Sequence, residues 1–144
     1  MYRSHIRLKR IRDPAEAGDG YRVLVDRVWP RGVARAQAAV DEWTKELAPS
    51  RELRQWFAHE PERWEAFRES YRSELAGVPE ALCQLVRRCA AEPVTLLFDA
   101  RDREYNQAVV LREVLAEELD AWYGAGEPAS PVCYRRHEGS EDPG

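Results

Sequence analysis

Residues 94–106 read VTLLFDARDREYN, a short apolar run followed by a charged turn. An apolar run without polar alternation is typical of a strand that is covered on both faces of a parallel sheet. Beyond the turn, Leu111, Leu115 and Leu119 recur at helical spacing, which predicts a helix over about 106–122. This stretch therefore predicts the strand–turn–helix unit from which α/β folds are built.

The sequence around this unit predicts further strands and a series of helices. Alternation and apolar runs predict strands at His5–Ile11, Tyr21–Val28 and, as a last edge strand, Val132–Arg135. Helical spacing and the breakers between the periodic segments predict helices at about 34–47, after Ser50, from Pro61 to Gly77 and after Pro79.

This order of elements indicates an α/β protein. We expect a small open, mostly parallel sheet flanked by helices, with a helical insertion in the middle of the chain. No internal repeat or linker indicates a second domain. One domain over 1–136 is therefore expected, followed by a disordered tail over 137–144.

Composition and charge argue against several classes of function. The chain of 144 residues has a formal net charge of −4, whereas nonspecific nucleic-acid binding relies on excess positive charge. No apolar run approaches the ~20 residues that a membrane span requires. The basic N-terminus is not followed by an apolar h-region, so we expect no secretory signal. Cys83, Cys89 and Cys133 form no C-x-x-C motif. We therefore expect three reduced thiols in a cytoplasmic protein without a membrane partner.

The first candidate site is the turn at 26–32, which reads DRVWPRG. In open α/β sheets, ligands bind outside the carboxyl ends of the strands. Arg27 and Arg31 frame a Trp29–Pro30 corner after Asp26, and guanidinium groups suit carboxylates and phosphates. The alternative is structural: an Asp–Arg pair fixes the corner while Trp29 covers the core.

The second candidate site is the turn from Asp99 to Asn106. The first turn of a helix favours anions, and Arg101 would strengthen that preference. Alternatively, acidic residues such as Asp102 simply cap the helix. The turn contains no glycine, so it is neither a Walker loop nor a dinucleotide-binding loop.

Proton transfer at such a site would fall to Asp26 or Asp102, with His59 as the other candidate. A lone histidine between two helices has a structural reading as well, as a hydrogen-bonding group. No His, Cys and carboxylate residues share metal-ligand spacing, so we expect neither a metal site nor a cofactor.

Four segments resemble a known family when they are taken together. They are RVLVDRVWPRG (22–32), DEWTKELAPS (41–50), LRQWFAHEPERWEAFRESYRSEL (53–75) and VTLLFDARDREYNQAVVLREVL (94–115). In this order they resemble the YeaO-like family of small bacterial proteins of unknown function over roughly residues 5–120. The string D-R-x-W-P-R-G is the most specific part.

The resemblance implies membership in a family, but it does not imply an activity. The family pattern matches at Asp26, Arg27, Trp29, Pro30, Arg31, Gly32, Trp43, Pro49, Ser50, Trp56, Phe57, His59, Trp64, Tyr71, Ala100, Asp102 and Asn106. Phe98, Asp99 and Arg101 depart from the tyrosine or serine and the lysine that members often carry there. No role for a hydroxyl group is therefore carried over.

Two hypotheses follow. In the first, the chain is a small-molecule-binding protein or enzyme for an anionic or nucleotide-like ligand. Arg27, Trp29, Arg31, Arg101 and Asn106 would bind that ligand. In the second, it is a non-catalytic module that binds nucleic acid or protein, with the tryptophan-rich helical middle as a homodimer face. The acidic net charge favours the first hypothesis.

Overall fold

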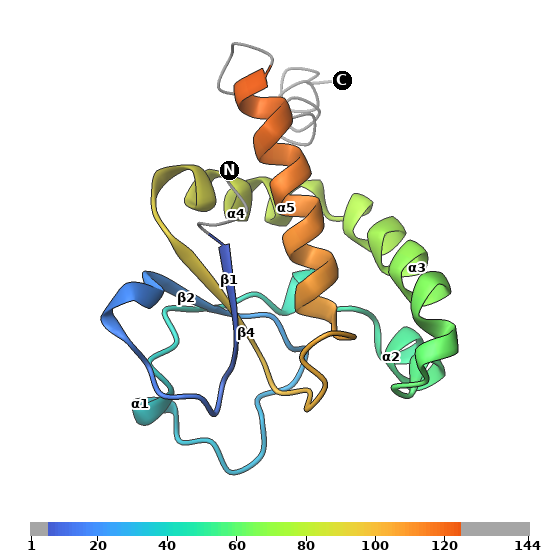
Figure 1. Cartoon of the computed structure of the whole chain (residues 1–144), viewed down its shortest axis with the longest axis horizontal. Coiled ribbons are helices and arrows are strands. Elements are labelled where there is room, and N and C mark those ends of the chain that lie inside the picture. The colour runs from blue at the N-terminus through green and yellow to red at the C-terminus, as the bar shows by residue number, and fades with distance from the viewer. Residues whose placement is uncertain (1–5, 125–144) are drawn as a thin grey trace, which may run out of the picture.

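The computed structural model describes residues 6–124, except for the side chains of 122–124. Their strands form one wholly parallel sheet in the order β1-β4-β2-β3 (Figure 1). The strands are β1 (Ile6–Arg10), β2 (Tyr21–Leu24), β3 (Glu42–Trp43) and β4 (Val94–Phe98). The predicted α/β class is confirmed, and β4 lies in the middle of the sheet as its buried apolar run indicated.

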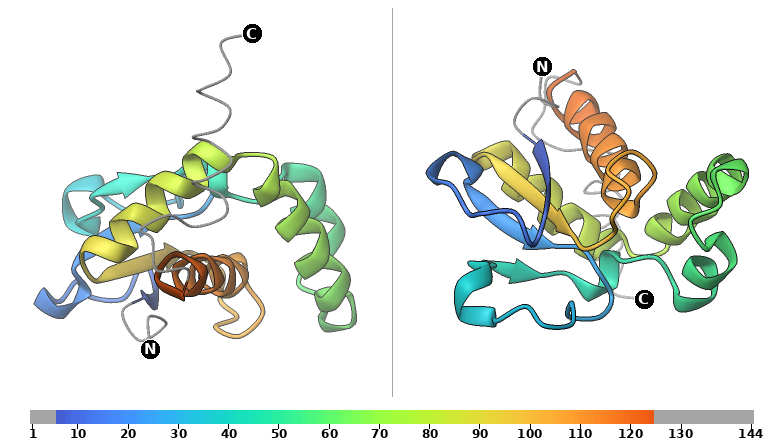
Figure 2. Two further views of the ribbon diagram at one scale, coloured as in Figure 1. Left: turned by 90° about the horizontal axis from the view of Figure 1, so that it is seen from above. Right: turned by 60° about the horizontal axis from the view of Figure 1, so that its bottom comes forward.

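Five α-helices accompany these strands in the described part of the chain. They are α1 (Arg35–Ala38), α2 (Arg51–Phe57), α3 (Trp64–Ala76), α4 (Pro79–Ala91) and α5 (Gln107–Gly124), with short 3-10 turns at Ala17–Asp19, Lys45–Leu47 and Pro61–Arg63. The predicted helical insertion corresponds to α2, α3 and α4. Figure 2 shows α2 and α3 standing to one side of the sheet. None of the described helices is long and apolar enough to cross a bilayer.

Successive residues of β4 face two different apolar layers, because side chains alternate along a strand. Leu96 and Phe98 join the larger cluster, which includes residues of α2, α3, α4 and α5. Leu97 joins a smaller cluster with Leu24 on the other face of the sheet, which the segment 29–43 covers. Helices therefore cover one face of the sheet, and an irregular segment covers most of the other.

The start of the helical insertion is held by its cap. Ser50 accepts a hydrogen bond from the backbone N–H of Leu53 (3.1 Å), and its hydroxyl donates to Glu74 of α3 (2.6 Å). The Tyr71 hydroxyl, also on α3, donates to the carbonyl of Leu47 (2.5 Å). These bonds fix α2 beside the carboxyl ends of the strands.

The predicted helix over 34–47 is wrong. The only helical elements of the segment are the short helix α1 and the 3-10 turn at Lys45–Leu47, because Ala39 adopts a left-handed φ of 52° and ends α1. The backbone N–H of Arg22 donates to the Asp41 carboxylate (2.8 Å), and β3 pairs with β2. Pairing at the sheet edge therefore overrides the helical spacing of the apolar residues. The expected strand at Val132–Arg135 lies outside the described residues.

The expectation of three reduced thiols is also wrong. Cys89 is a free, buried thiol, whereas Cys83 is disulfide-bonded. The reduced-thiol argument for a cytoplasmic location therefore no longer holds.

We predict that Gly20→Ala destabilises the fold strongly. Gly20 has a φ of +67°, and a Cβ atom there would lie 2.3 Å from the carbonyl oxygen of Pro93. Positive φ and a backbone clash together should lower the free energy of unfolding by roughly 2–5 kcal/mol. Chemical denaturation measures this loss.

Gly32→Ala is the matched control, since Gly32 has a φ of +80° but open space around its Cβ position. Its free energy of unfolding should fall only by about 1–2 kcal/mol, which is the cost of the left-handed backbone conformation for a residue with a Cβ atom. Equal losses in the two variants would show that the contact with Pro93 is not what requires glycine at position 20.

Candidate functional site

The two charged turns predicted from the sequence lie along one cleft. The cleft consists of two adjoining cavities of about 530 and 630 Å³. Both are lined by Asp26, Val28, Arg54, His59 and Ala100. The volumes fall within the ~300–1,000 Å³ that is usual for small-molecule sites. The cleft lies at the carboxyl ends of β2 and β4, where the parallel topology places ligand sites.

Asp26 follows β2 and forms the centre of the cleft. Its side chain is 5% exposed. The backbone N–H of Asp99 donates to one carboxylate oxygen (3.0 Å), and the side-chain amide of Gln107 donates to the other. The indole N–H of Trp43 donates to the backbone carbonyl of Asp26 (2.7 Å). Asp26 therefore connects the end of β2 to the end of β4, to the first turn of α5 and to β3.

Burial changes the acidity of this carboxyl group. Loss of hydration raises the pKa of Asp26 from 3.8 to about 6, and the positive charge of Arg54 only partly opposes that rise. A carboxyl group with this pKa changes its charge close to neutral pH. The charge at the centre of the cleft is thus sensitive to pH.

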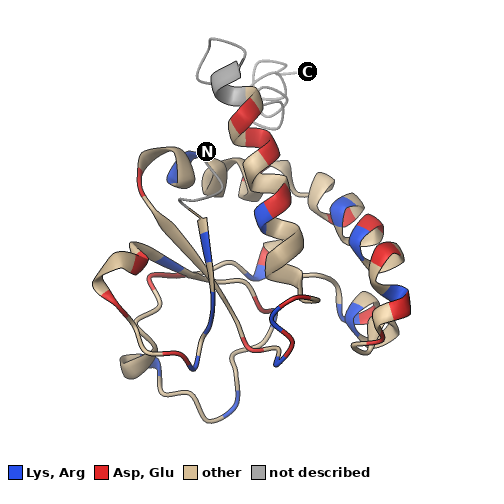
Figure 3. Cartoon of the chain, in the orientation of Figure 1, with Lys and Arg blue, Asp and Glu red and all other residues tan. Residues whose placement is uncertain are grey.

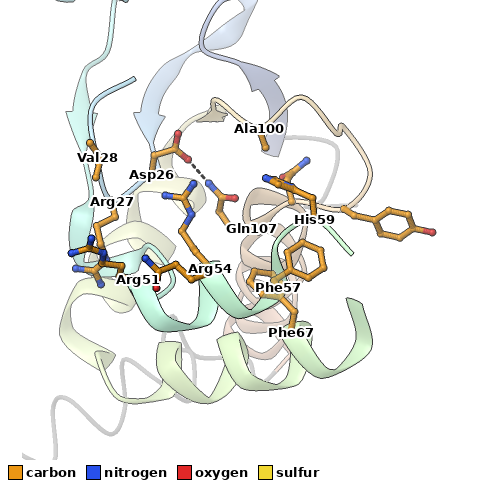
Figure 4. A pocket seen from close by; sticks show the side chains of 13 residues that line it. Asp26, Arg27, Val28, Arg51, Arg54, Phe57, His59, Phe67, Ala100 and Gln107 are labelled. Carbon is orange, nitrogen blue, oxygen red and sulfur yellow. Dashed lines mark hydrogen bonds between the residues drawn. The ribbon is translucent and has the colours of Figure 1, made fainter. Parts of the chain in front are cut away.

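Arginines surround Asp26 on several sides. Arg54 of α2 lines both cavities, Arg27 and Arg51 line the first, and Arg31 and Arg101 line the second. No carboxylate in the described part of the chain lies within 4.0 Å of these five guanidinium groups. In Figure 4, Arg54 extends toward Asp26, while Arg27 and Arg51 lie together at one end of the first cavity.

The other end of the first cavity is aromatic. Phe57 of α2 stacks on Phe67 of α3, with ring centroids 4.5 Å apart, and both rings line the cavity together with Tyr105. His59 lies beside them, 6.0 Å from the Phe57 ring (Figure 4). His59 and Ala58 both have left-handed φ values, 59° and 47°. This bend after α2 brings the imidazole to the cleft.

Three of the predicted site residues use their polar groups within the fold. The indole N–H of Trp29 donates to the Val33 carbonyl (2.7 Å). The Asp102 carboxylate accepts from the backbone N–H groups of Glu104 (2.8 Å) and Tyr105 (3.0 Å), which lowers its pKa. The Asn106 side-chain oxygen accepts from the N–H of Val109 (3.2 Å) at the start of α5. These groups shape the cleft and cap the helix.

The eight predicted site residues therefore meet at one cleft, but not in one cavity. Asp26 and His59 line both cavities, Arg27 and Asn106 only the first, and Trp29, Arg31, Arg101 and Asp102 only the second. No group of three or more His, Cys, Asp or Glu side chains within 6–124 is arranged to hold a metal ion.

The structure adds residues that the sequence reasoning missed. Arg54, Gln107, Phe57 and Phe67 line the cleft, yet each lies inside a helix and matches an ordinary helical pattern. Gln107 directly follows the predicted turn, so extending that turn by one residue would have included it. No local signal distinguishes Arg54 from the other exposed arginines.

The raised pKa of Asp26 predicts a pH-dependent stability. A carboxyl group with a higher pKa in the folded chain than in the unfolded chain holds its proton more tightly when folded. The free energy of unfolding should therefore fall as the pH rises from about 4 to about 6, and then level off. A shift of this size corresponds to roughly 3 kcal/mol. Asp26→Asn should lack this fall, since Gln107 can turn its amide to accept from asparagine.

The measurement is denaturation of both proteins between pH 4 and pH 7. As the pH rises, the free energy of unfolding of the unmodified protein should fall relative to that of Asp26→Asn. A difference that does not vary with pH would contradict the assignment of the raised pKa to Asp26.

Comparison with known proteins places the chain in a family. Residues 5–135 match the family model described as "Inactive DUF488-N3 subclade". The chain is 45% identical to the uncharacterised protein YeaO of Escherichia coli (strain K12) over 111 residues, which are 77% of this chain and 96% of YeaO. It is 37% identical to the uncharacterised protein Rv3073c of Mycobacterium tuberculosis (strain ATCC 25618 / H37Rv) over 112 residues, 78% of this chain and 94% of that protein.

No solved structure was found to match. The family model extends over nearly the whole chain, including both charged turns and the helical insertion between them. The resemblance to YeaO-like proteins is thus confirmed, and the chain belongs to the family described as the inactive DUF488-N3 subclade.

Proposed function

We propose that this protein binds an anionic small molecule in the cleft between its two charged turns, and that it does so without catalysing a reaction on that molecule. The observation that carries the proposal is the set of arginines in the cleft that have no carboxylate partner among residues 6–124. Guanidinium groups are planar, permanently charged donors, and they suit carboxylates and phosphates.

The charge balance of the cleft supports an anionic ligand. Its lining includes five arginines (Arg27, Arg31, Arg51, Arg54 and Arg101) but only three carboxylates (Asp26, Asp99 and Asp102). One of the three, Asp99, is already paired with Arg12 outside the cleft (2.7 Å). The cleft is therefore locally cationic in a chain whose net charge is −4.

The wider charge distribution supports a local site. Figure 3 shows basic and acidic residues mixed along α3 and in the turn between β4 and α5. A nucleic-acid-binding surface would instead need a continuous basic stripe that contacts many phosphates. A small ligand that contacts two or three guanidinium groups fits this pattern better.

Two observations favour binding over catalysis. The family to which the chain belongs is described as an inactive subclade. In addition, both oxygens of Asp26 accept hydrogen bonds from Asp99 and Gln107, and the Asp102 carboxylate caps the turn before α5. These hydrogen bonds occupy the two carboxylates that would otherwise serve for proton transfer.

The test is anion-dependent thermal stabilisation, because a ligand that binds only the folded state raises the unfolding temperature. Inorganic pyrophosphate is the probe. Arg54→Ala should weaken its binding by roughly 10- to 100-fold, which corresponds to the loss of one or two charged hydrogen bonds. Arg31→Ala should also weaken it.

Arg87→Ala is the matched control, since Arg87 is an exposed arginine of α4 that lines neither cavity. This variant should respond to pyrophosphate as the unmodified protein does. If pyrophosphate does not stabilise the unmodified protein, or if all three variants lose the response equally, the proposed site is wrong.

A further inference from the structure

We propose that the ligand of the first cavity is an adenine mononucleotide, whose base edge is recognised by the side-chain amide of Gln107 and whose phosphate is held by Arg27 and Arg51. This inference rests on the proposed function and names the chemical class of the anion. Two features of the cavity support it: its division into a cationic and an aromatic end, and the fixed amide between them.

The cavity has two chemically different ends. The guanidinium groups of Arg27 and Arg51 lie together at one end, and Phe57, Phe67 and His59 lie at the other (Figure 4). The Nε atom of Arg27 donates to the Pro49 carbonyl (3.3 Å), which fixes the base of that guanidinium group and leaves its two terminal nitrogens without a partner among the described residues. A phosphate accepts hydrogen bonds from such nitrogens.

The aromatic end suits a planar ring. Phe57 and Phe67 are only 4% and 2% exposed and stack on each other, so they form the apolar floor of this end. The rings that a planar ligand can lie against are His59, which is exposed, and Tyr105, which is half buried. Aromatic side chains stack on the faces of nucleobases, and this contact is more favourable than the contact that an aliphatic group would make there. A ligand that fills the whole cavity therefore needs a flat ring at one end and a negative charge at the other.

Gln107 lies between the two ends and is 7% exposed. Its amide nitrogen donates to Asp26, and its amide oxygen has no hydrogen-bond partner in the described part of the chain. The nitrogen carries a second hydrogen, so the amide still offers one donor and one acceptor side by side. Adenine presents the complementary pair, an amino donor next to a ring-nitrogen acceptor, and glutamine pairs with it in a bidentate manner.

The orientation of this amide is fixed, and that gives it selectivity. Asp26 accepts from the amide nitrogen and is itself held by the N–H of Asp99 (3.0 Å). Turning the amide by 180° would place its oxygen against the carboxylate, which is unfavourable whenever Asp26 is ionised. A base with an oxo group in place of the amino group would therefore place two acceptors against each other.

The experiment compares ligands on the unmodified protein by titration calorimetry at pH 7.5. The probes are adenosine 5′-monophosphate, inosine 5′-monophosphate, ribose 5-phosphate and pyrophosphate. Inosine monophosphate differs from the adenine nucleotide at the 6-position of the base, where an oxo group replaces the amino group. We expect the adenine nucleotide to bind about 10- to 100-fold more tightly than inosine monophosphate, which is the discrimination that one bidentate pair provides.

Variants then show which residues distinguish the adenine nucleotide from inosine monophosphate. Gln107→Leu should bring the affinities of the two nucleotides together, whereas Arg51→Ala should weaken both nucleotides and ribose 5-phosphate by a similar factor. Gln84→Leu is the matched control, because Gln84 is an exposed glutamine of α4 outside both cavities. It should leave the ratio unchanged. Should Gln107→Leu fail to fold, the ligand comparison on the unmodified protein still decides.

The outcomes separate this inference from the proposed function. Equal binding of both nucleotides and ribose 5-phosphate would overturn the adenine assignment while leaving anion binding intact. Binding of pyrophosphate without binding of any nucleotide would do the same. If none of the four probes binds, both the inference and the proposed function fail.

Discussion

The hydrogen bonds of the Asp26 carboxylate connect the parts of the molecule on which the cleft depends. Asp26 follows β2, yet its partners are the backbone of Asp99 after β4 and the side chain of Gln107 in α5. Its own carbonyl accepts from Trp43 of β3. One buried residue thus joins three strands and a helix at the edge where parallel strands end. Removing its partners would leave a buried charge without compensation, which is strongly unfavourable.

The same arrangement explains why the cleft stays open and cationic. The carboxylates nearest to it are engaged: Asp26 with backbone and amide donors, Asp99 with Arg12, and Asp102 with the turn before α5. Among residues 6–124, no carboxylate lies within 4.0 Å of the guanidinium groups of the cleft. Arg54 influences Asp26 through its field without forming an ion pair within 4.0 Å. This positive charge, which no ion pair among the described residues neutralises, is the basis of the proposed anion binding.

Membership in the inactive DUF488-N3 subclade agrees with the proposal of binding without catalysis. A buried carboxyl group with a raised pKa is often a catalytic acid or base, but burial in a purely structural position raises the pKa in the same way, and the hydrogen bonds from Asp99 and Gln107 oppose that rise. Here both oxygens of Asp26 are occupied, so its position fits a residue that orients Gln107 and holds the strand ends together. The left-handed residues Ala58 and His59 complete the wall of the cleft after α2.

Local sequence determined the elements whose signal is local. The apolar run at 94–98, the capped helix after Ser50 and the charged turns after β2 and β4 follow from residue spacing, because each depends on neighbours within a few positions. Tertiary structure decided the rest. The segment 34–47 has helical spacing but is drawn to the edge of β2 by Asp41 and Trp43. Arg54 and Gln107 reach the cleft only because α2 and α5 dock at the strand ends. These contacts join residues up to 81 positions apart. They stabilise the protein only after folding has brought the distant segments together, so residue spacing within one segment does not reveal them.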